Sequence, residues 1–218
     1  MIRLENIFIS LENNKNLIRD INIFIPSGSM ISIVGGSGSG KTKLLKIMGL
    51  EEKASKGKLF ILGKNINKLS RSELAKLHTE ISIVNEKNDL LENFGVKENI
   101  IFPLIVTKKK SKEIEIALNE LVSWLNIGKI LEKNIYTLSR TEEKLVQFAR
   151  AIIIRPRMLL LDNFFSGMNY ELVKKIFYLL VALKKIGTTT ISFGSEVNND
   201  VINFSTKYKI QNSTIVML

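Results

Sequence analysis

The sequence predicts an α/β fold, and two observations indicate it. First, short apolar runs typical of buried strands alternate along the chain with stretches whose apolar residues recur at helical spacing. Second, the glycine-rich run GGSGSGKT at 35–42 follows an apolar run and precedes a helical stretch, and it fits the pattern G-x-x-x-x-G-K-[ST] of a P-loop. Elements that alternate around such a loop favour a sheet whose strand tips bind phosphates.

The first half of the chain predicts strands on both sides of the P-loop. They are expected at 2–9, 21–25, 30–34, 58–62 and 81–84, with a turn at 13–16. The predicted helices are 43–48, directly after the P-loop, and a short one that ends at Leu77. Ser70 and Glu73 have the spacing of a capping box, which predicts where this second helix begins.

The second half of the chain continues the alternation. It predicts helices at 114–125, 145–154 and 172–185, strands at 158–162 and 188–193, and a hairpin of 207–210 and 214–218. Pro156 ends the second of these helices, and Gly187 follows the third. Asp162 lies at the tip of a wholly apolar strand, about 120 residues after Lys41. In P-loop proteins a carboxylate at this Walker B position holds Mg²⁺ through water.

The composition limits the classes of function. The 218 residues suit one domain, and the absence of Cys excludes disulfides and thiolate metal sites. The net charge is +11, but only seven of the 32 basic residues are Arg and Lys is spread along the chain. An AT-biased genome explains this charge, so we predict no nucleic-acid partner. No uncharged apolar run approaches the ~20 residues of a membrane span, and the run 100–106 has only seven. With no signal peptide at the start, the sequence predicts a cytoplasmic protein.

The P-loop carries the predicted binding chemistry. Its glycines allow positive φ, so that successive N–H groups can point at phosphate oxygens, and the helix that follows adds a partial positive charge. Lys41 would reach the β- and γ-phosphates of ATP, while Thr42 and Asp162 would hold Mg²⁺. The predicted nucleotide-binding residues of the loop are Gly35, Gly36, Ser37, Gly38, Ser39, Gly40, Lys41 and Thr42. The alternative, a flexible glycine loop without a ligand, is disfavoured by the strand and helix that flank it.

With these motifs in place, the whole chain resembles the ATP-binding subunits of ABC systems. The segments that look most like the cell-division family FtsE are 1–6 (MIRLEN), 69–74 (LSRSEL), 98–104 (ENIIFPL) and 121–125 (LVSWL). The related families LolD, for lipoprotein release, and MacB, for macrolide export, share Pro103 and Leu104. The resemblance implies a single P-loop NTPase domain of the ABC ATPase type over 1–218. It also implies a mixed core sheet, an antiparallel β subdomain and a helical subdomain inserted at roughly 87–155.

In this family two subunits sandwich two ATP molecules, and each ATP contacts the P-loop of one subunit and the signature motif, LSGGQ or LSGGE, of the other. The motif falls here on 138–142 (LSRTE), so Arg140 and Thr141 replace both glycines and obstruct the approach of the helix N-terminus to the γ-phosphate. Ser139, the remaining nucleotide-binding candidate, has capping-box spacing with Glu142, so we expect the helix start to persist. Alternatively, the Arg140 guanidinium itself pairs with phosphate.

The resemblance also assigns the catalytic positions, and this chain departs from the family at several of them. Asn163 replaces the glutamate that polarises the attacking water, Glu86 replaces the Q-loop glutamine, and Ser195 replaces the switch histidine. Asn169 replaces the D-loop aspartate, and Lys43 replaces a Ser or Thr. An amide cannot take a proton from water, and loss of a general base typically costs about 10²–10⁴ in rate. We therefore predict slow or absent hydrolysis.

These observations predict an FtsE-like subunit that forms a homodimer when ATP is bound and couples its nucleotide state to an integral membrane partner of the FtsX type. It would lie on the cytoplasmic face of the inner membrane, with 86–106 and the following helix forming the groove for the partner. Two alternatives stay open: the ATPase of a LolD- or MacB-like transporter, and a docking scaffold that binds no nucleotide. Lys43 and the missing adenine-stacking aromatic near Leu11 favour the scaffold. His78 is expected at an exposed helix end, and Phe94 and Trp124 are expected to be packing residues.

Overall fold

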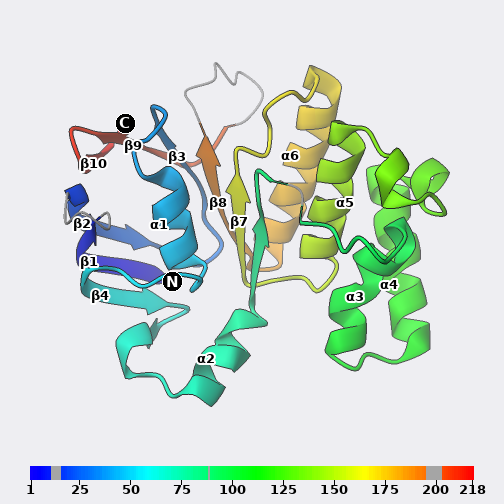
Figure 1. Ribbon diagram of the computed structural model, residues 1–218, viewed down its shortest axis with the longest axis horizontal. Coiled ribbons are helices and arrows are strands. Elements are labelled where there is room, and N and C mark those ends of the chain that lie inside the picture. Colours follow the sequence, from blue (N-terminus) through cyan, green and yellow to red (C-terminus); the bar gives the residue numbers. More distant parts are fainter. Residues whose placement is uncertain (11–15, 88, 195–202) are drawn as a thin grey trace.

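The computed structural model describes residues 1–10, 16–87, 89–194 and 203–218. The strands are β1 (Ile2–Ser10), β2 (Asn16–Ile25), β3 (Met30–Gly35), β4 (Lys56–Ile61), β5 (Lys64–Asn65), β6 (Ile81–Val84), β7 (Met158–Asp162), β8 (Thr189–Gly194), β9 (Thr206–Gln211) and β10 (Thr214–Met217). The α-helices are α1 (Lys41–Met48), α2 (Arg71–His78), α3 (Val96–Val106), α4 (Ser111–Leu125), α5 (Arg140–Ile152) and α6 (Tyr170–Lys185). Figure 1 shows α1 between two sheets, with α3 to α6 on the other side of the larger sheet.

The larger sheet leads into the P-loop. Its strand order is β10-β9-β3-β8-β7-β6, and its strands pair in parallel except for β10, which is antiparallel to β9. Both β3 and β7 pair with β8, so their carboxyl ends lie at the same edge of the sheet. This arrangement brings the P-loop, which follows β3, close to Asp162, the last residue of β7.

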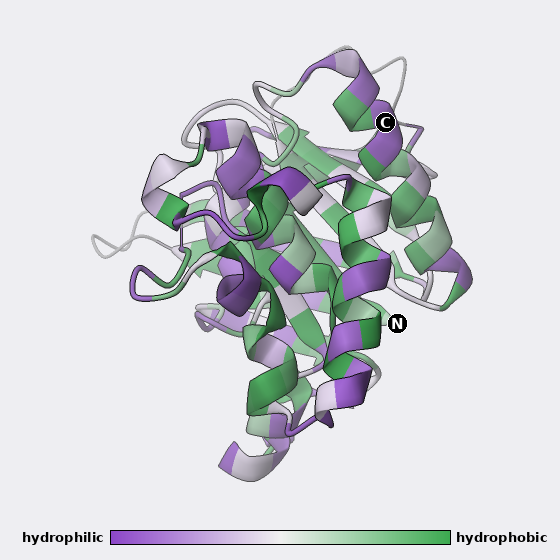
Figure 2. Cartoon of the chain, turned by 90° about the vertical axis from the view of Figure 1, so that its right-hand side faces the viewer, coloured by the Kyte–Doolittle hydropathy of each residue, from purple (hydrophilic) through white to green (hydrophobic). Residues whose placement is uncertain are grey.

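Apolar residues form a core on each face of the larger sheet. The core toward α3 to α6 includes Phe148, Leu161 and Ile176, and the core around α1 includes Leu44 and Phe193, all of them fully buried. Because both faces are covered, every residue of β7 is buried, as its continuous apolar run predicts. Figure 2 shows the same pattern, with apolar strands inside and helices that are apolar on one side and polar on the other.

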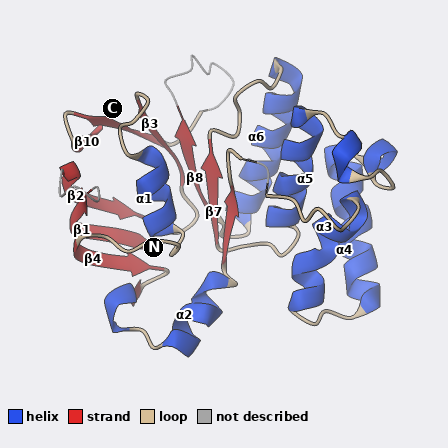
Figure 3. Cartoon of the chain, viewed as in Figure 1, coloured by secondary structure: helices blue, strands red, loops and turns tan. Residues whose placement is uncertain are grey.

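The smaller sheet is antiparallel and has the order β2-β1-β4-β5. Along β1 the buried residues are Ile2, Leu4, Ile7 and Ile9, and they pack with α1 in the second core. Figure 3 shows this sheet apart from the helices α3 and α4. The predicted α/β class, with its mixed core sheet and its antiparallel sheet, is therefore confirmed.

Helix α3 is the main element that the sequence analysis did not predict. Pro103 lies inside it, where the ring removes one backbone hydrogen bond and argues against a helix. Its apolar residues also surround the helix rather than marking one face, since Ile100 is buried whereas Ile105 and Val106 are exposed. The fully buried Asn99 stabilises the start of the helix, because its Nδ2 donates to the carbonyl oxygens of Leu91, Phe94 and Gly95.

Other boundaries differ where polar residues hide the periodicity. Helix α5 begins at Arg140, as the capping box of Ser139 and Glu142 predicts, whereas its apolar periodicity begins only at Leu145 because the first turn is polar. Strand β2 begins at Asn16, within the predicted turn, and the rest of that turn lies outside the described residues. The capping box that opens α2 is confirmed, with Ser70 and Glu73 bonded to each other. In the described ranges, no helix has the length and apolar character needed to cross a membrane.

Candidate functional site

The P-loop joins β3 to α1 with a backbone that requires glycine at one position in particular. Gly40 has a φ of 98° immediately before α1, and a Cβ there would lie 2.8 Å from Cδ1 of Ile18. A side chain at this position would therefore be strained and crowded. No side chain caps α1, so the first N–H groups of the helix are available to an anion.

Lys41 lies across the P-loop. Its Nζ donates to the carbonyl oxygens of Gly35, at 2.6 Å, and Gly36, at 2.7 Å. Burial lowers the pKa of Lys41, whereas the negative charges of Asp162 and Glu86 act in the opposite direction. A phosphate group in the loop would add negative charge beside this ammonium and favour its protonated form.

Thr42 and Asp162, the two predicted Mg²⁺ ligands, lie together. The hydroxyl of Thr42 donates to Oδ2 of Asp162 at 3.4 Å, and Asp162 is 6% exposed. Burial and the charge of Glu86 raise the pKa of Asp162, which the Thr42 hydrogen bond and Lys41 partly oppose. A hydroxyl and a carboxylate are hard oxygen donors, and Mg²⁺ is usually bound by one or two such protein groups together with phosphates. The donor set at this edge of the sheet therefore fits a magnesium–nucleotide complex.

Asn163 and Glu86, two of the predicted catalytic residues, contact each other. The side-chain Nδ2 of Asn163 donates to Oε1 of Glu86 at 2.5 Å, although the two residues are 77 positions apart in the sequence. The backbone of Asn163 is fixed to β8, because its N–H donates to the carbonyl oxygen of Phe193 at 2.8 Å. Glu86 follows β6 and is exposed. A carboxylate and an amide thus meet beside the buried Asp162.

Lys144 belongs to this site, although no sequence motif indicated it. It lies in the first half of α5, and its Nζ donates to the carbonyl oxygens of Asn163 (3.4 Å), Phe164 (3.3 Å) and Ser166 (2.8 Å). Burial lowers the pKa of Lys144, and the charge of Glu86 acts against this decrease. The lysine connects α5 to the loop that follows β7, a contact between segments that sequence spacing alone does not reveal.

Ser139 caps the N-terminus of α5, and the predicted capping box is confirmed. Both the backbone N–H and the hydroxyl of Ser139 donate to Oε2 of Glu142 at 2.8 Å, and the N–H of Glu142 donates back to Oγ of Ser139 at 3.3 Å. The bonds from Ser139 hold the pKa of Glu142 below its ordinary value. Arg140, the next residue, is exposed.

Two of the positions that were predicted to depart from the family pattern make structural contacts. The ammonium of Lys43 pairs with Glu52 at 3.0 Å, which lowers the pKa of that glutamate. The side chain of Asn169 caps α6 by accepting a hydrogen bond from the N–H of Leu172 at 2.9 Å. Ser195, predicted to replace the switch histidine, and Leu11 lie outside the described residues.

The predictions for residues away from the P-loop were partly wrong. His78 is the exposed last residue of α2, as predicted. Trp124 and Phe94, predicted to be packing residues, are 53% and 41% exposed. The buried face of α4 includes Leu125, and Trp124, the residue before it, lies outside that face. The apolar character of Trp124 was therefore a misleading indication of burial. Phe94 lies 6.0 Å, between ring centroids, from the exposed Phe102.

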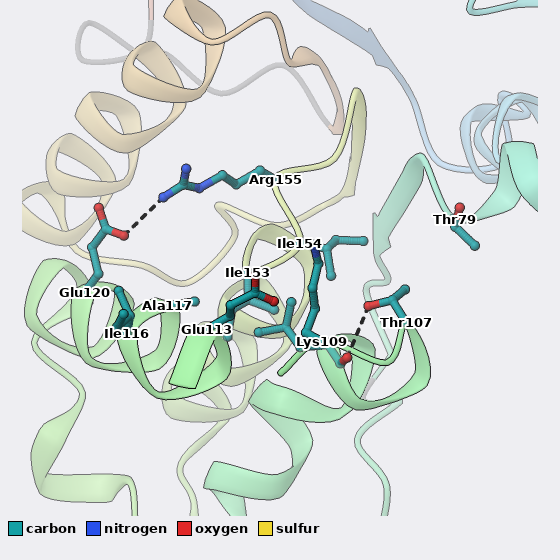
Figure 4. A pocket seen from close by; sticks show the side chains of 11 residues that line it. Thr79, Thr107, Lys109, Glu113, Ile116, Ala117, Glu120, Ile153, Ile154 and Arg155 are labelled. Atoms are coloured by element: carbon teal, nitrogen blue, oxygen red, sulfur yellow. Dashed lines mark hydrogen bonds and ion pairs between the residues drawn. The ribbon is translucent and has the colours of Figure 1, made fainter. Parts of the chain in front are cut away.

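A groove of about 450 Å³ lies away from the P-loop residues. Figure 4 shows its lining, which comes from the end of α3, the first part of α4 and the segment after α5. Its lining residues are Thr79, Leu104, Thr107, Lys109, Glu113, Ile116, Ala117, Glu120, Ile153, Ile154 and Arg155. Arg155 and Glu120 form an ion pair at 3.1 Å across one end.

Known proteins resemble this chain in sequence and in fold. A family model described as "ABC transporter" matches residues 18–166, more than half of the chain. The lipoprotein-releasing system ATP-binding protein LolD of Rickettsia bellii is 27% identical over 220 residues, which cover 100% of this chain and 98% of that protein. LolD of Francisella tularensis subsp. holarctica is 30% identical over 77% of this chain and 73% of that protein.

The fold has a solved counterpart. The dimeric structure of a post-hydrolysis state of the ATP-binding cassette MJ0796 bound to ADP and Pi matches with a TM-score of 0.89 and 23% identity. The match covers 99% of this chain and 96% of that one. At this identity the likeness shows the fold alone.

Proposed function

Because this chain belongs to the ABC transporter family, as an ATP-binding domain, we propose that it binds Mg-ATP at the P-loop and couples its nucleotide state to an integral membrane partner. One observation carries the proposal: Lys41 spans the P-loop while Thr42 and Asp162 lie together beside it. Lys41 would bind the β- and γ-phosphates, and Thr42 and Asp162 would hold Mg²⁺. Bound Mg²⁺ supplies positive charge that neutralises the phosphates.

For the complex to which the subunit belongs, we favour a LolD-like system. The support is the likeness to LolD of Rickettsia bellii, which extends over the full length of this chain. A cell-division complex of the FtsEX kind is the second candidate, and the segments 1–6 and 69–74 support it. Identification of the membrane protein that co-purifies with the tagged chain distinguishes them: a lipoprotein-release subunit supports the first, and an FtsX-type subunit supports the second.

We further propose that two copies associate when ATP is bound, each offering Ser139 at the start of α5 to the nucleotide of the other. Arg140 and Thr141 crowd that surface, and Asn163 is no proton acceptor. Hydrolysis is therefore expected to be slower than about 1 per second, the lower end of ordinary enzyme turnover. We retain the division predicted from the sequence, one domain over 1–218 with a helical subdomain at roughly 87–155.

The partner is proposed to dock on the segment 86–106 and α4. In that region Phe102, Ile105, Val106 and Ile116 are exposed apolar side chains, and Ile116 also lines the groove of about 450 Å³. An amphipathic cytoplasmic helix of an integral membrane protein would cover such a surface. Docking of this kind would place the chain on the cytoplasmic face of the membrane.

Equilibrium binding of Mg-ATP, measured by calorimetry, tests the proposal. Lys41→Ala should weaken binding by about 10- to 100-fold, because a hydrogen bond from a charged group contributes about 1.5–3 kcal/mol. Lys185→Ala, which removes a positive charge from an exposed residue at the end of α6, is the matched control and should bind as the wild type does. If the wild type does not bind Mg-ATP at millimolar concentration, the docking scaffold is the correct reading instead.

A further inference from the structure

Two carboxylates, those of Asp162 and Glu86, interact electrostatically with the ammonium of Lys41, and they differ in how exposed they are to solvent. Asp162 is buried at the end of β7 and accepts a hydrogen bond from Thr42. Glu86 is exposed and reaches the same region from the segment that follows β6. Asp162 is the proposed Mg²⁺ ligand and is buried. Glu86 is therefore the carboxylate of this pair that solvent water can reach.

Asn163 holds Glu86 in this place. Its backbone is fixed twice, since its N–H donates to Phe193 and its carbonyl oxygen accepts from Lys144. From this fixed backbone the amide Nδ2 donates to Oε1 of Glu86 at 2.5 Å. The bond engages one of the two carboxylate oxygens of Glu86, and an ionised carboxylate has further acceptor capacity.

Glu86 interacts with two lysines of the site. Lys41 and Lys144 both interact with it electrostatically, one from the P-loop and one from α5. The carboxylate of Glu86 is therefore within electrostatic range of two ammonium groups, one of them in the loop proposed to bind the γ-phosphate. The hydrogen bond from Asn163, the residue after Asp162, distinguishes Glu86 from a surface glutamate that contacts only solvent.

We propose that Glu86 supplies the carboxylate that orients the attacking water and accepts its proton, and that Asn163 is the positioning residue for Glu86. The inference rests on the proposed function, because it requires ATP in the P-loop. In the step itself, the water oxygen forms a bond to the γ-phosphorus and the bond from that phosphorus to the β–γ bridging oxygen breaks. ADP leaves, one proton of the water passes to Glu86, and the other stays on the inorganic phosphate.

The first experiment measures single-turnover hydrolysis of radiolabelled Mg-ATP by the full chain. We expect slow but measurable hydrolysis by the wild type and a loss of about 10²-fold or more in Glu86→Gln, the typical cost of losing a general base. Glu132→Gln, a change at an exposed carboxylate in the loop after α4, is the matched control and should hydrolyse at the wild-type rate. Equal rates for Glu86→Gln and the wild type would overturn the proposal, and so would no hydrolysis by a wild type that binds ATP.

A second readout does not depend on turnover. Glu86→Gln should bind Mg-ATP at least as tightly as the wild type, because it removes negative charge near the phosphates. It should also accumulate as an ATP-dependent dimer in size-exclusion chromatography, since the nucleotide is no longer consumed. Weaker ATP binding together with a lower melting temperature would assign Glu86 a structural role and contradict the inference.

The exchange of side chains gives a third test. The double variant Glu86→Gln, Asn163→Glu moves the carboxylate to the position after Asp162 and keeps one amide and one carboxylate in the pair. It should recover hydrolysis relative to Glu86→Gln alone, with an unchanged melting temperature, and a folded double variant that is no faster contradicts the proposal. Absence of Mg-ATP binding by the wild type would instead remove the proposed function, so the two failures are distinguishable.

Discussion

At the scale of single residues, Asp162 carries a charge that the nucleotide-free fold disfavours. Burial and the nearby Glu86 raise its pKa above the ordinary value. The folded chain therefore binds this proton more tightly than the unfolded chain does, and the contribution of Asp162 to stability increases as the pH falls toward its folded pKa. At neutral pH the ionised carboxylate costs stability, which is the opposite of the usual case of a carboxylate in an ion pair.

We accordingly predict that Asp162→Asn raises the melting temperature of the nucleotide-free protein at pH 7. The same variant should lose any further increase that Mg²⁺ gives in the presence of ATP, because the ligand for the ion is gone. Differential scanning fluorimetry with and without Mg-ATP measures both effects. A variant that melts below the wild type at pH 7 would show that the carboxylate stabilises the fold.

The sequence indicated individual site residues to different degrees. Lys41, Thr42 and Asp162 could be predicted because a fixed pattern follows one strand and a lone acid ends another. The contact between Glu86 and Asn163 could not, because it depends on the pairing of β6 with β7, which places two distant strand ends side by side. Lys144 was missed because one lysine among many in the chain has no local signal.

At the scale of elements, the start of α5 depends on its capping box. Ser139 is the N-cap, and it makes reciprocal hydrogen bonds with Glu142. These bonds lower the pKa of Glu142, so their contribution is present above its unfolded pKa and is lost as the pH falls through the folded value. The cap therefore stabilises the start of a helix whose first turn contains Arg140 and Thr141.

Ser139→Ala should destabilise the fold by about 1 kcal/mol, the usual effect of removing an N-cap, or about 2–4 °C in melting temperature for a domain of this size. The destabilisation should be smaller at a pH below the folded pKa of Glu142 than at pH 7, because the carboxylate is protonated there. Thermal unfolding at both pH values measures it, with Ser111→Ala as control, because Ser111 lies inside the first turn of α4 rather than at its cap. Equal melting temperatures for Ser139→Ala and the wild type at pH 7 would show that the cap contributes nothing.

Helices and strands whose apolar residues recur regularly could be predicted from the sequence, whereas helix α3, which lacks such a pattern, could not. Strand β7 has a continuous apolar run, and α6 has an amphipathic pattern with lysines at its end. Helix α3 has neither, because Pro103 interrupts it and its apolar residues lie on several faces. Its stability comes from tertiary contacts, among them the buried amide of Asn99, which no local pattern reports.

At the scale of the whole molecule, α3 and α4 carry several exposed apolar side chains, and one of them, Ile116, lines the groove of about 450 Å³. A surface of this kind on a folded domain is typical of an interaction site. Ile105 and Ile116 are 51% and 59% exposed, so a charge at either position should not disturb the core.

We predict that Ile105→Asp and Ile116→Asp reduce co-purification of the membrane partner while Mg-ATP binding stays at the wild-type level. Met217→Asp, at a similarly exposed apolar residue on β10, should have no effect on either measurement. Quantitative affinity purification from solubilised membranes makes the comparison. Undiminished recovery of the partner with both groove variants would place the docking surface elsewhere.

The three carbonyl oxygens held by Lys144 have a mechanical consequence. Through them, the first half of α5 is fastened to the turn that contains Asn163 and Ser166. A tilt of α5 would move this turn and reorient the side-chain amide of Asn163, which donates a hydrogen bond to Glu86. If two copies associate at the start of α5, as proposed, a displacement of this helix by the neighbouring copy would therefore reach Asn163 through the hydrogen bonds of Lys144.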